Sequence, residues 1–459
     1  MQDTPARGIS KKTTNFVLMK KIVLAAAAAV LVWSCGDKQN PVVTDPIQNP
    51  VVTDPIDVSF PTPTKQITKV ELSETEQGYV EAGNGMAFRF LNQMYSGENI
   101  VLSPLSLQFA LAMAANGAEG ETLQEIIDFL GYGDDGIEAL NAYSKKLLEQ
   151  LPAVDLDIKL KLTDALLVNK EFPLLPAFRQ TVQQNYYAAV DNMDFSDPAA
   201  VAARINEWAA RSTDGFIDKM LEPNDISKDL VAAIMNALYF KAKWSGSEYD
   251  PMFLEESTTT EAFTLADGSK KQVPFLRNKR YHRYAQMDGY SVLALPYAGE
   301  KYFMYILLPD ENSNLDALVQ KLPDISWKTI LDSFKTDAEV YVKLPKFDME
   351  NKFDLMDALQ ALGMQKPFEP GVAEFDRMFE PKPGYYYWIS RVIQKARISV
   401  AECGTEAAAV TVVMMSGESA GPGEEQPKPV YFFADHPFLF FIGEATSGTI
   451  LFEGAYTGK

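Results

Sequence analysis

Apolar residues recur at helical spacing in the first half of the chain. In residues 83–95, apolar side chains stand three or four positions apart, which is typical of a helix with one buried face. Residues 104–115 predict a second helix, because Ser103 can cap its start and Pro104 suits its first turn. Two further helices are predicted, over residues 122–130 and 200–211.

The second half of the chain changes to strand patterns rich in β-branched and aromatic residues. The apolar stretch over residues 230–240 is ambiguous at its start and predicts a strand over residues 236–240. Further strands are predicted over residues 291–297, 302–308, 338–343 and 397–402, and a C-terminal hairpin over residues 438–443 and 449–456. Helices come early and strands come late, without regular alternation of the two. The pattern therefore predicts an α+β fold.

The N-terminus has the pattern of an export signal. Basic residues precede an apolar run over residues 22–33, which is too short to span a bilayer. We expect a signal peptide over residues 1–34, with translation starting at Met19. The run ends in Ser34-Cys35, which resembles a bacterial lipobox with Cys35 as the lipidated residue; an ordinary signal peptide cut nearby is the alternative.

A tandem repeat of nine residues follows, over residues 40–48 and 49–57. Its prolines favour an extended chain rather than a helix or a sheet. We expect residues 35–65 to form a lipid-anchored linker and residues 66–459 to form one globular domain. Several acyl chains would anchor the protein stably. By resemblance to bacterial envelope sorting rules, Gly36 rather than Asp after the cysteine implies an outer-membrane lipoprotein of the bacterial cell envelope, either surface-exposed or periplasmic.

Charge and composition narrow the possible chemistry. The formal net charge is −20, from 42 basic and 62 acidic residues, so a nucleic-acid partner is not expected. Two cysteines and two histidines are too few for a disulfide framework or a zinc cluster, and no metal or cofactor is expected. His282 and His436 are interpreted as packing residues.

One motif suggests an esterase. Residues 417–421 fit the G-x-S-x-G pattern, in which Ser419 would be the nucleophile. That pattern requires a helix directly afterwards, but Pro422 and further prolines follow. The only downstream histidine is His436, beside Asp435, and too little chain remains for a hydrolase fold. We therefore expect no enzyme.

Seven short segments stand out along the chain: residues 99–106 (NIVLSPLS), 236–244 (NALYFKAKW), 295–297 (LPY), 307–310 (LLPD), 344–347 (LPKF), 402–409 (ECGTEAAA) and 436–440 (HPFLF). In this order and spacing they resemble the serpin family, over residues 70–457. The resemblance implies about three β-sheets, eight or nine helices and an exposed reactive-centre loop.

Within that loop the resemblance assigns a hinge, made of Glu402, Gly404, Thr405, Glu406, Ala407, Ala408 and Ala409. The residues themselves agree with this assignment. Alternate positions from Thr405 to Met415 would share one face of a strand, and none of them is charged. The segment could thus lie in a loop or be buried in a sheet, although a permanent interior strand is the alternative.

Residues 416–429 are polar and rich in glycine and proline, so an exposed, cleavable loop is expected. The family's spacing of fourteen residues from Gly404 places the reactive bond at Glu418–Ser419. Met415–Ser416 is a second candidate, which would suit proteases with apolar pockets. Counting back from the strand at residues 430–433 leads instead to residues 423–424.

By resemblance, Ser103, Ser106, Asn236 and Gln394 belong to a region that regulates sheet opening. Gln394 stands where many members have histidine, so pH switching at that position is not expected. Cys403 lies beside the hinge, and we interpret it as a bystander thiol rather than a redox switch.

The resemblance predicts a monomeric inhibitor of serine proteases that acts as a suicide substrate, with cysteine proteases left open as a further target class. The protein would contact the membrane only through its N-terminal lipid. The alternative is a non-inhibitory binding protein with the serpin fold, whose loop is cut without trapping the protease.

Overall fold

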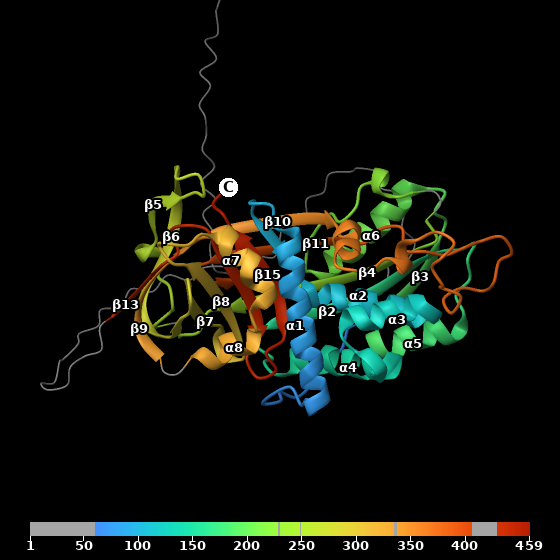
Figure 1. Ribbon diagram of the computed structural model, residues 1–459, viewed down its shortest axis with the longest axis horizontal. Helices are drawn as coiled ribbons and strands as arrows, with labels where there is room; N and C mark the ends of the chain where they lie inside the picture. Colours follow the sequence, from blue (N-terminus) through green and yellow to red (C-terminus); the bar gives the residue numbers. More distant parts are fainter. Residues whose placement is uncertain (1–59, 228–229, 248, 335–336, 406–428) are drawn as a thin grey trace, which may run out of the picture.

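The described part of the chain folds into two β-sheets flanked by helices (Figure 1). The computed structural model describes residues 60–227, 230–247, 249–334, 337–405 and 429–459. The helices within these ranges are α1 Glu74–Met94, α2 Pro104–Gly117, α3 Gly120–Leu130, α4 Gly136–Gln150, α5 Pro176–Tyr186, α6 Pro198–Ser212, α7 Leu315–Lys321, α8 Trp327–Ser333 and α9 Met356–Ala361. None of the helices in this part of the chain is long and apolar enough to cross a membrane.

The larger sheet has nine strands in the order β1-β15-β14-β8-β7-β6-β9-β13, with β5 beside β6. Its strands are β1 Ile100–Leu102, β5 Thr259–Thr264, β6 Lys270–Gln286, β7 Tyr290–Pro296, β8 Tyr302–Pro309, β9 Asp337–Pro345, β13 Val430–Phe433, β14 Phe438–Glu444 and β15 Ile450–Tyr456. Strand β6 pairs with β7 near one end and with β5 and β9 over the rest. It therefore joins two groups of strands in one continuous ladder.

The smaller sheet has six strands in the order β10-β11-β12-β4-β2-β3. They are β2 Lys159–Asn169, β3 Ala189–Met193, β4 Ala232–Lys243, β10 Phe347–Asp354, β11 Ile393–Ala401 and β12 Gly404–Thr405. The α+β prediction is confirmed, and so are the four predicted helices, within α1, α2, α3 and α6, and the terminal hairpin β14–β15. Ser103 caps α2 as expected, because its hydroxyl accepts a hydrogen bond from the Ser106 N–H.

Strand alternation divides the interior into two cores. On β2, Leu160 and Leu166 belong to the main core with α2, whereas Ala165 and Leu167 belong to a second core. That second core lies against α6, with the buried Trp208 among its members. The smaller sheet is therefore covered by apolar groups on both faces, and a strand within it needs apolar residues on both sides.

Candidate functional site: a gap between β4 and β11

Within the described ranges, the smaller sheet has a gap at its centre, between β4 and β11. Strand β12 has only two residues, yet it pairs with β11 on one side and β4 on the other. Beyond those two residues, the facing edges of β11 (393–399) and β4 (232–241) have no ladder partner among the described residues. Backbone groups at such edges are available to a further strand.

A cavity of about 360 Å³ lies along this gap. Strand β4 contributes Ile234 and Asn236 to its lining, and β11 contributes Ile393 and Gln394. Helix α2 lines the inner side, and residues that follow α6, among them Met220, Leu221 and Ile226, line the α6 side. The gap is thus enclosed by mostly apolar groups and bordered by two open strand edges.

Gly404 is required at the upper end of the gap by both its conformation and its surroundings. Its φ is +149°, which side-chain-bearing residues rarely adopt. A Cβ at this position would stand 2.0 Å from the carbonyl oxygen of Ala242. Only glycine therefore lets β12 approach β4 this closely.

Thr405 directs its side chain into the main core. It is 3% exposed, and its hydroxyl lies 2.5 Å from the hydroxyl of Tyr297. Tyr297 stacks on Trp244, with the ring centroids 4.6 Å apart and the planes 5° from parallel. The indole Nε1 of Trp244 donates to the carbonyl of Ala401 at 2.8 Å, so the two aromatic rings hold both sides of the turn into β12.

Glu402 is buried at this turn, and both of its carboxylate oxygens accept hydrogen bonds. Its carboxylate accepts hydrogen bonds from Thr258 Oγ1 and Lys346 Nζ, each at 2.8 Å. Burial acts to raise the pKa of Glu402, but these two donors lower it below its ordinary value. Cys403 follows in the same turn, half-buried, and its carbonyl accepts from the Trp244 N–H.

The predicted sheet-opening residues gather around the lower part of the gap. Gln394 clamps the backbone of Ser103: its Nε2 donates to the Ser103 carbonyl at 2.8 Å, and its Oε1 accepts from the Ser103 N–H at 3.0 Å. Ser106, Asn236 and Gln394 line one cavity. Strand β11 is thereby tied to the start of α2.

Asn236 does not share this clamp. Its Nδ2 donates to Asp164 Oδ1 of β2 at 2.7 Å, and the two residues are directly opposite in the ladder. Sequence reasoning missed Asp164, although an acid inside the apolar run 160–168 was a signal of it. Asp164 is 1% exposed, and burial raises its pKa to about 7 against the effect of the Asn236 hydrogen bond.

The other predicted site residues, Glu406, Ala407, Ala408, Ala409, Met415, Ser416, Glu418, Ser419 and Cys35, lie outside the described residues. Both histidines have structural contacts. His282 Nε2 is 3.1 Å from Asn278 Oδ1, and His436 Nε2 is 2.9 Å from the Pro309 carbonyl. Across the described ranges, no group of His, Cys, Asp and Glu side chains is arranged as a metal site.

Comparison with known proteins identifies the family. The family model described as Serpin (serine protease inhibitor) matches residues 81–458. The chain belongs to the serpin family. Serpin-ZX of Arabidopsis thaliana is 31% identical over 80% of this chain and 94% of its own length. Iripin-2 of Ixodes ricinus is 32% identical over 83% of this chain and 94% of its own length.

Solved structures agree with this assignment. Tengpin, a thermophilic serpin in its native state, superposes with a TM-score of 0.75 at 27% identity, covering 87% of this chain and 98% of its own. Serpins are mostly protease inhibitors rather than catalysts. Among the described residues of this serpin, β4 and β11 are joined through β12 alone, at one end of the gap.

Proposed function

We propose that this serpin inhibits serine proteases as a suicide substrate, by inserting its cut loop between β4 and β11. The main support for this proposal is that β12 already pairs with β11 on one side and with β4 on the other, at the upper end of the gap. The new hydrogen bonds along two open edges, together with apolar burial, would drive insertion after cleavage. The uncut protein must then be held short of its most stable form.

The length of β4 supports this proposal. Thr405 pairs with Ala242 in an antiparallel ladder, so each further loop residue would meet the preceding residue of β4. Continued in this register, Met415 would oppose Ala232, the first residue of β4. The insertable segment predicted from its uncharged face ends at the same residue.

The two faces of the gap also suit this segment. Thr405 and its partner Ala242 face the main core, so residues 407, 409, 411, 413 and 415 would face it too. These residues are Ala, Ala, Thr, Val and Met. On the α6 side, Val410 and Val412 would stand opposite Ala237 and Met235 of the second core. Glu406 would stand opposite Lys241, its natural charge partner.

Glu418–Ser419 remains the proposed reactive bond, with Met415–Ser416 as the second candidate. Cleavage at either bond would leave the whole segment up to Met415 attached to β12. Glu418 would suit a glutamate-preferring protease, and Met415 would suit an elastase-like, chymotrypsin-like or cysteine protease. The sequence at the reactive bond therefore determines which class of protease cleaves the loop. Insertion of the cut loop into the gap between β4 and β11 determines whether that protease is trapped.

The test is to mix the full chain with a panel of serine and cysteine proteases and to run denaturing gels. We expect a covalent adduct that survives denaturation, and a released C-terminal fragment that begins at Ser419 or Ser416. Thr405→Arg should abolish the adduct but allow cleavage, because a charged side chain cannot enter the pocket beside Tyr297. Thr405→Ser is the matched control and should retain the adduct. Cleavage of the unmodified chain without any adduct would favour the non-inhibitory binding protein.

We also propose that residues 1–34 are a signal peptide, that residues 35–65 are a lipid-anchored linker, and that residues 66–459 are a monomeric domain on the outer membrane. The apolar run and the motif that ends at Cys35 support this. Expression in a bacterium with labelled palmitate should label the protein, and Cys35→Ser should remove the label. Labelling that persists in Cys35→Ser would overturn the proposed anchor.

A further inference from the structure

Residues 213–227, here termed the strap, connect α6 to the approach to β4 and lie along the gap. Met220, Leu221 and Ile226 of the strap line the cavity between β4 and β11. The same three side chains belong to the second core, together with Met235 of β4. The strap is therefore the wall of the gap on the α6 side, opposite the wall that α2 forms.

Helix α6 holds one side of the strap. The Asn206 side chain accepts hydrogen bonds from the N–H groups of Met220 and Leu221 at 2.6 and 2.8 Å, and donates to the Leu221 carbonyl at 2.7 Å. Helix α6 is in turn joined to β3 by an ion pair between Arg204 and Asp191. This side of the strap is therefore attached, through α6, to the half of the sheet that contains β2, β3 and β4.

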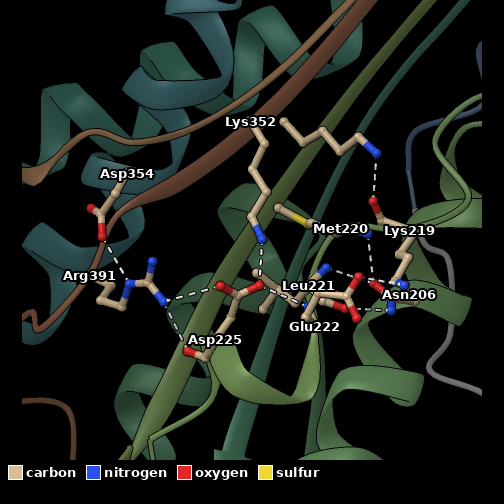
Figure 2. A network of polar contacts seen from close by, with 10 residues as sticks. Asn206, Lys219, Met220, Leu221, Glu222, Asp225, Lys352, Asp354 and Arg391 are labelled. Atoms are coloured by element: carbon tan, nitrogen blue, oxygen red, sulfur yellow. Dashed lines mark hydrogen bonds and ion pairs between the residues drawn. The ribbon is translucent and has the colours of Figure 1, made fainter.

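Cations from across the gap hold the other side of the strap (Figure 2). Asp225 receives a hydrogen bond from Lys352 of β10, and its carbonyl accepts from Arg391 at 3.0 Å. The guanidinium of Arg391 is fixed by Asp354, which accepts from its Nε at 2.8 Å. Burial acts to raise the pKa of Asp225, but the donors, above all Lys352, hold it below its ordinary value. Asp225 is therefore charged at neutral pH.

Two more cations of β11 reach the strap backbone. Lys395 Nζ donates to the Lys219 carbonyl at 2.6 Å, and Arg397 Nη1 donates to the Phe216 carbonyl at 3.1 Å. The Arg397 guanidinium also lies over the Phe216 ring, 4.6 Å from its centroid. Strands β10 and β11 thus grip the strap at three points along its length.

We propose that the strap is an ionic latch across the gap, in which Lys352 and Arg391 hold Asp225 and slow the relative movement of the two halves of the sheet. Neighbouring strands of a sheet are about 4.8 Å apart, so insertion of a strand must separate β4 from β11 by a distance of that order. A hydrogen bond cannot stretch by that much without breaking. The contacts at Asp225 must open during that movement. This inference rests on the proposed strand insertion and adds its regulation.

The test uses the full chain carrying Lys352→Met and Arg391→Gln together, which keeps most of the side-chain volume and removes both cations. Two rates are measured: hydrogen exchange of residues 213–227, and uptake of a synthetic peptide with the sequence of residues 405–415, followed by native gel. We expect both rates to rise about tenfold, because three partly exposed ion pairs and their hydrogen bonds are lost, two of them at Asp225. Raising the salt concentration should accelerate the unmodified chain more than the variant.

Lys219→Gln is the matched control. Its side chain pairs with Glu222 at 2.5 Å inside the strap and does not cross the gap, so both rates should stay within about twofold of the unmodified chain. The latch is refuted if the double variant exchanges and takes up peptide at the unmodified rate, or if Lys219→Gln accelerates as much. The covalent adduct is scored separately, so absence of an adduct with intact latch behaviour would count against the proposed function alone.

Discussion

Asn236 of β4 and Asp164 of β2 share one hydrogen bond of 2.7 Å inside the sheet, at the border of the gap. The second oxygen of Asp164 is buried and has no hydrogen-bond partner among the described residues. A carboxyl group placed in this way is most stable when it carries its proton. Tyr186 is the titratable neighbour whose own pKa this carboxyl raises further.

Asp164→Asn should stabilise the uncut protein above neutral pH. The pKa of Asp164 is about 7 in the folded state, against an ordinary value of 3.8, so the folded state is penalised progressively as pH rises from about 4 to 7. Removing that penalty should add about 4 kcal/mol at pH 8 and little below pH 4. Denaturant unfolding at several pH values measures the difference. An unchanged pH dependence in Asp164→Asn would show that the carboxyl does not titrate in this range; Asp157→Asn, at an exposed site, is the control.

Under the proposed function, Gly404→Ala should convert the protein from an inhibitor into a substrate of the protease. The added methyl group would meet the Ala242 carbonyl, and the φ of +149° disfavours alanine further. Strand β12 could then no longer start the insertion, so cleavage should proceed while the adduct is lost. Gly78→Ala, within α1, should leave the adduct unchanged, because a Cβ added there would meet no atom within 4 Å. A full yield of adduct from Gly404→Ala would contradict the role assigned to β12.

Tyr297→Phe should loosen the hinge without disturbing its packing. The stack on Trp244 is kept, and only the hydrogen bond to Thr405 is lost, at a cost of about 1 kcal/mol. Hydrogen exchange at residues 404–405 should therefore accelerate about fivefold. Tyr302→Phe removes a comparable hydroxyl, which donates to the Leu151 carbonyl away from the hinge, and should not change that exchange. Equal acceleration by both variants would mean that the effect is not local.

Glu453→Met should raise the melting temperature of the uncut protein. Glu453 is fully buried in β15, and neither carboxyl oxygen has a hydrogen-bond partner in the described part of the chain. Burial raises its pKa far above the ordinary value, so folding becomes less favourable as pH rises above about 4.5. The gain should be larger at pH 8 than at pH 5 in thermal unfolding. Glu453→Gln should gain less, since its amide stays unsatisfied; a larger gain from Gln than from Met would contradict this account.

Much of the fold was predictable from local patterns. The cap at Ser103 and the apolar periodicity of α2 follow from sequence because they depend on neighbouring residues. Strand β6 was not predicted, since its residues are largely polar and many of them are exposed. Its strand character comes from pairing with β5, β7 and β9, which single-sequence patterns do not reveal.

Some parts of the candidate site could also be predicted from the sequence, and others could not. The hinge could be proposed because residues 402–409 resemble the family's hinge and alternate positions after Gly404 are uncharged, but the strap could not be proposed. Asp225 meets Lys352 at a separation of 127 residues and Arg391 at a separation of 166. A surface aspartate in a connecting segment carries no local mark of such partners, so only the three-dimensional arrangement reveals them.

The double hydrogen bond between Gln394 and Ser103 has a mechanical consequence. It fastens the start of α2 to β11, so we expect α2 to stay with β10 and β11 during the proposed insertion. Strands β2, β3 and β4, together with α6, would then move across the surface of α2. Ala110 and Ala114 of α2 line the cavity, and their small side chains would offer little steric resistance to this movement.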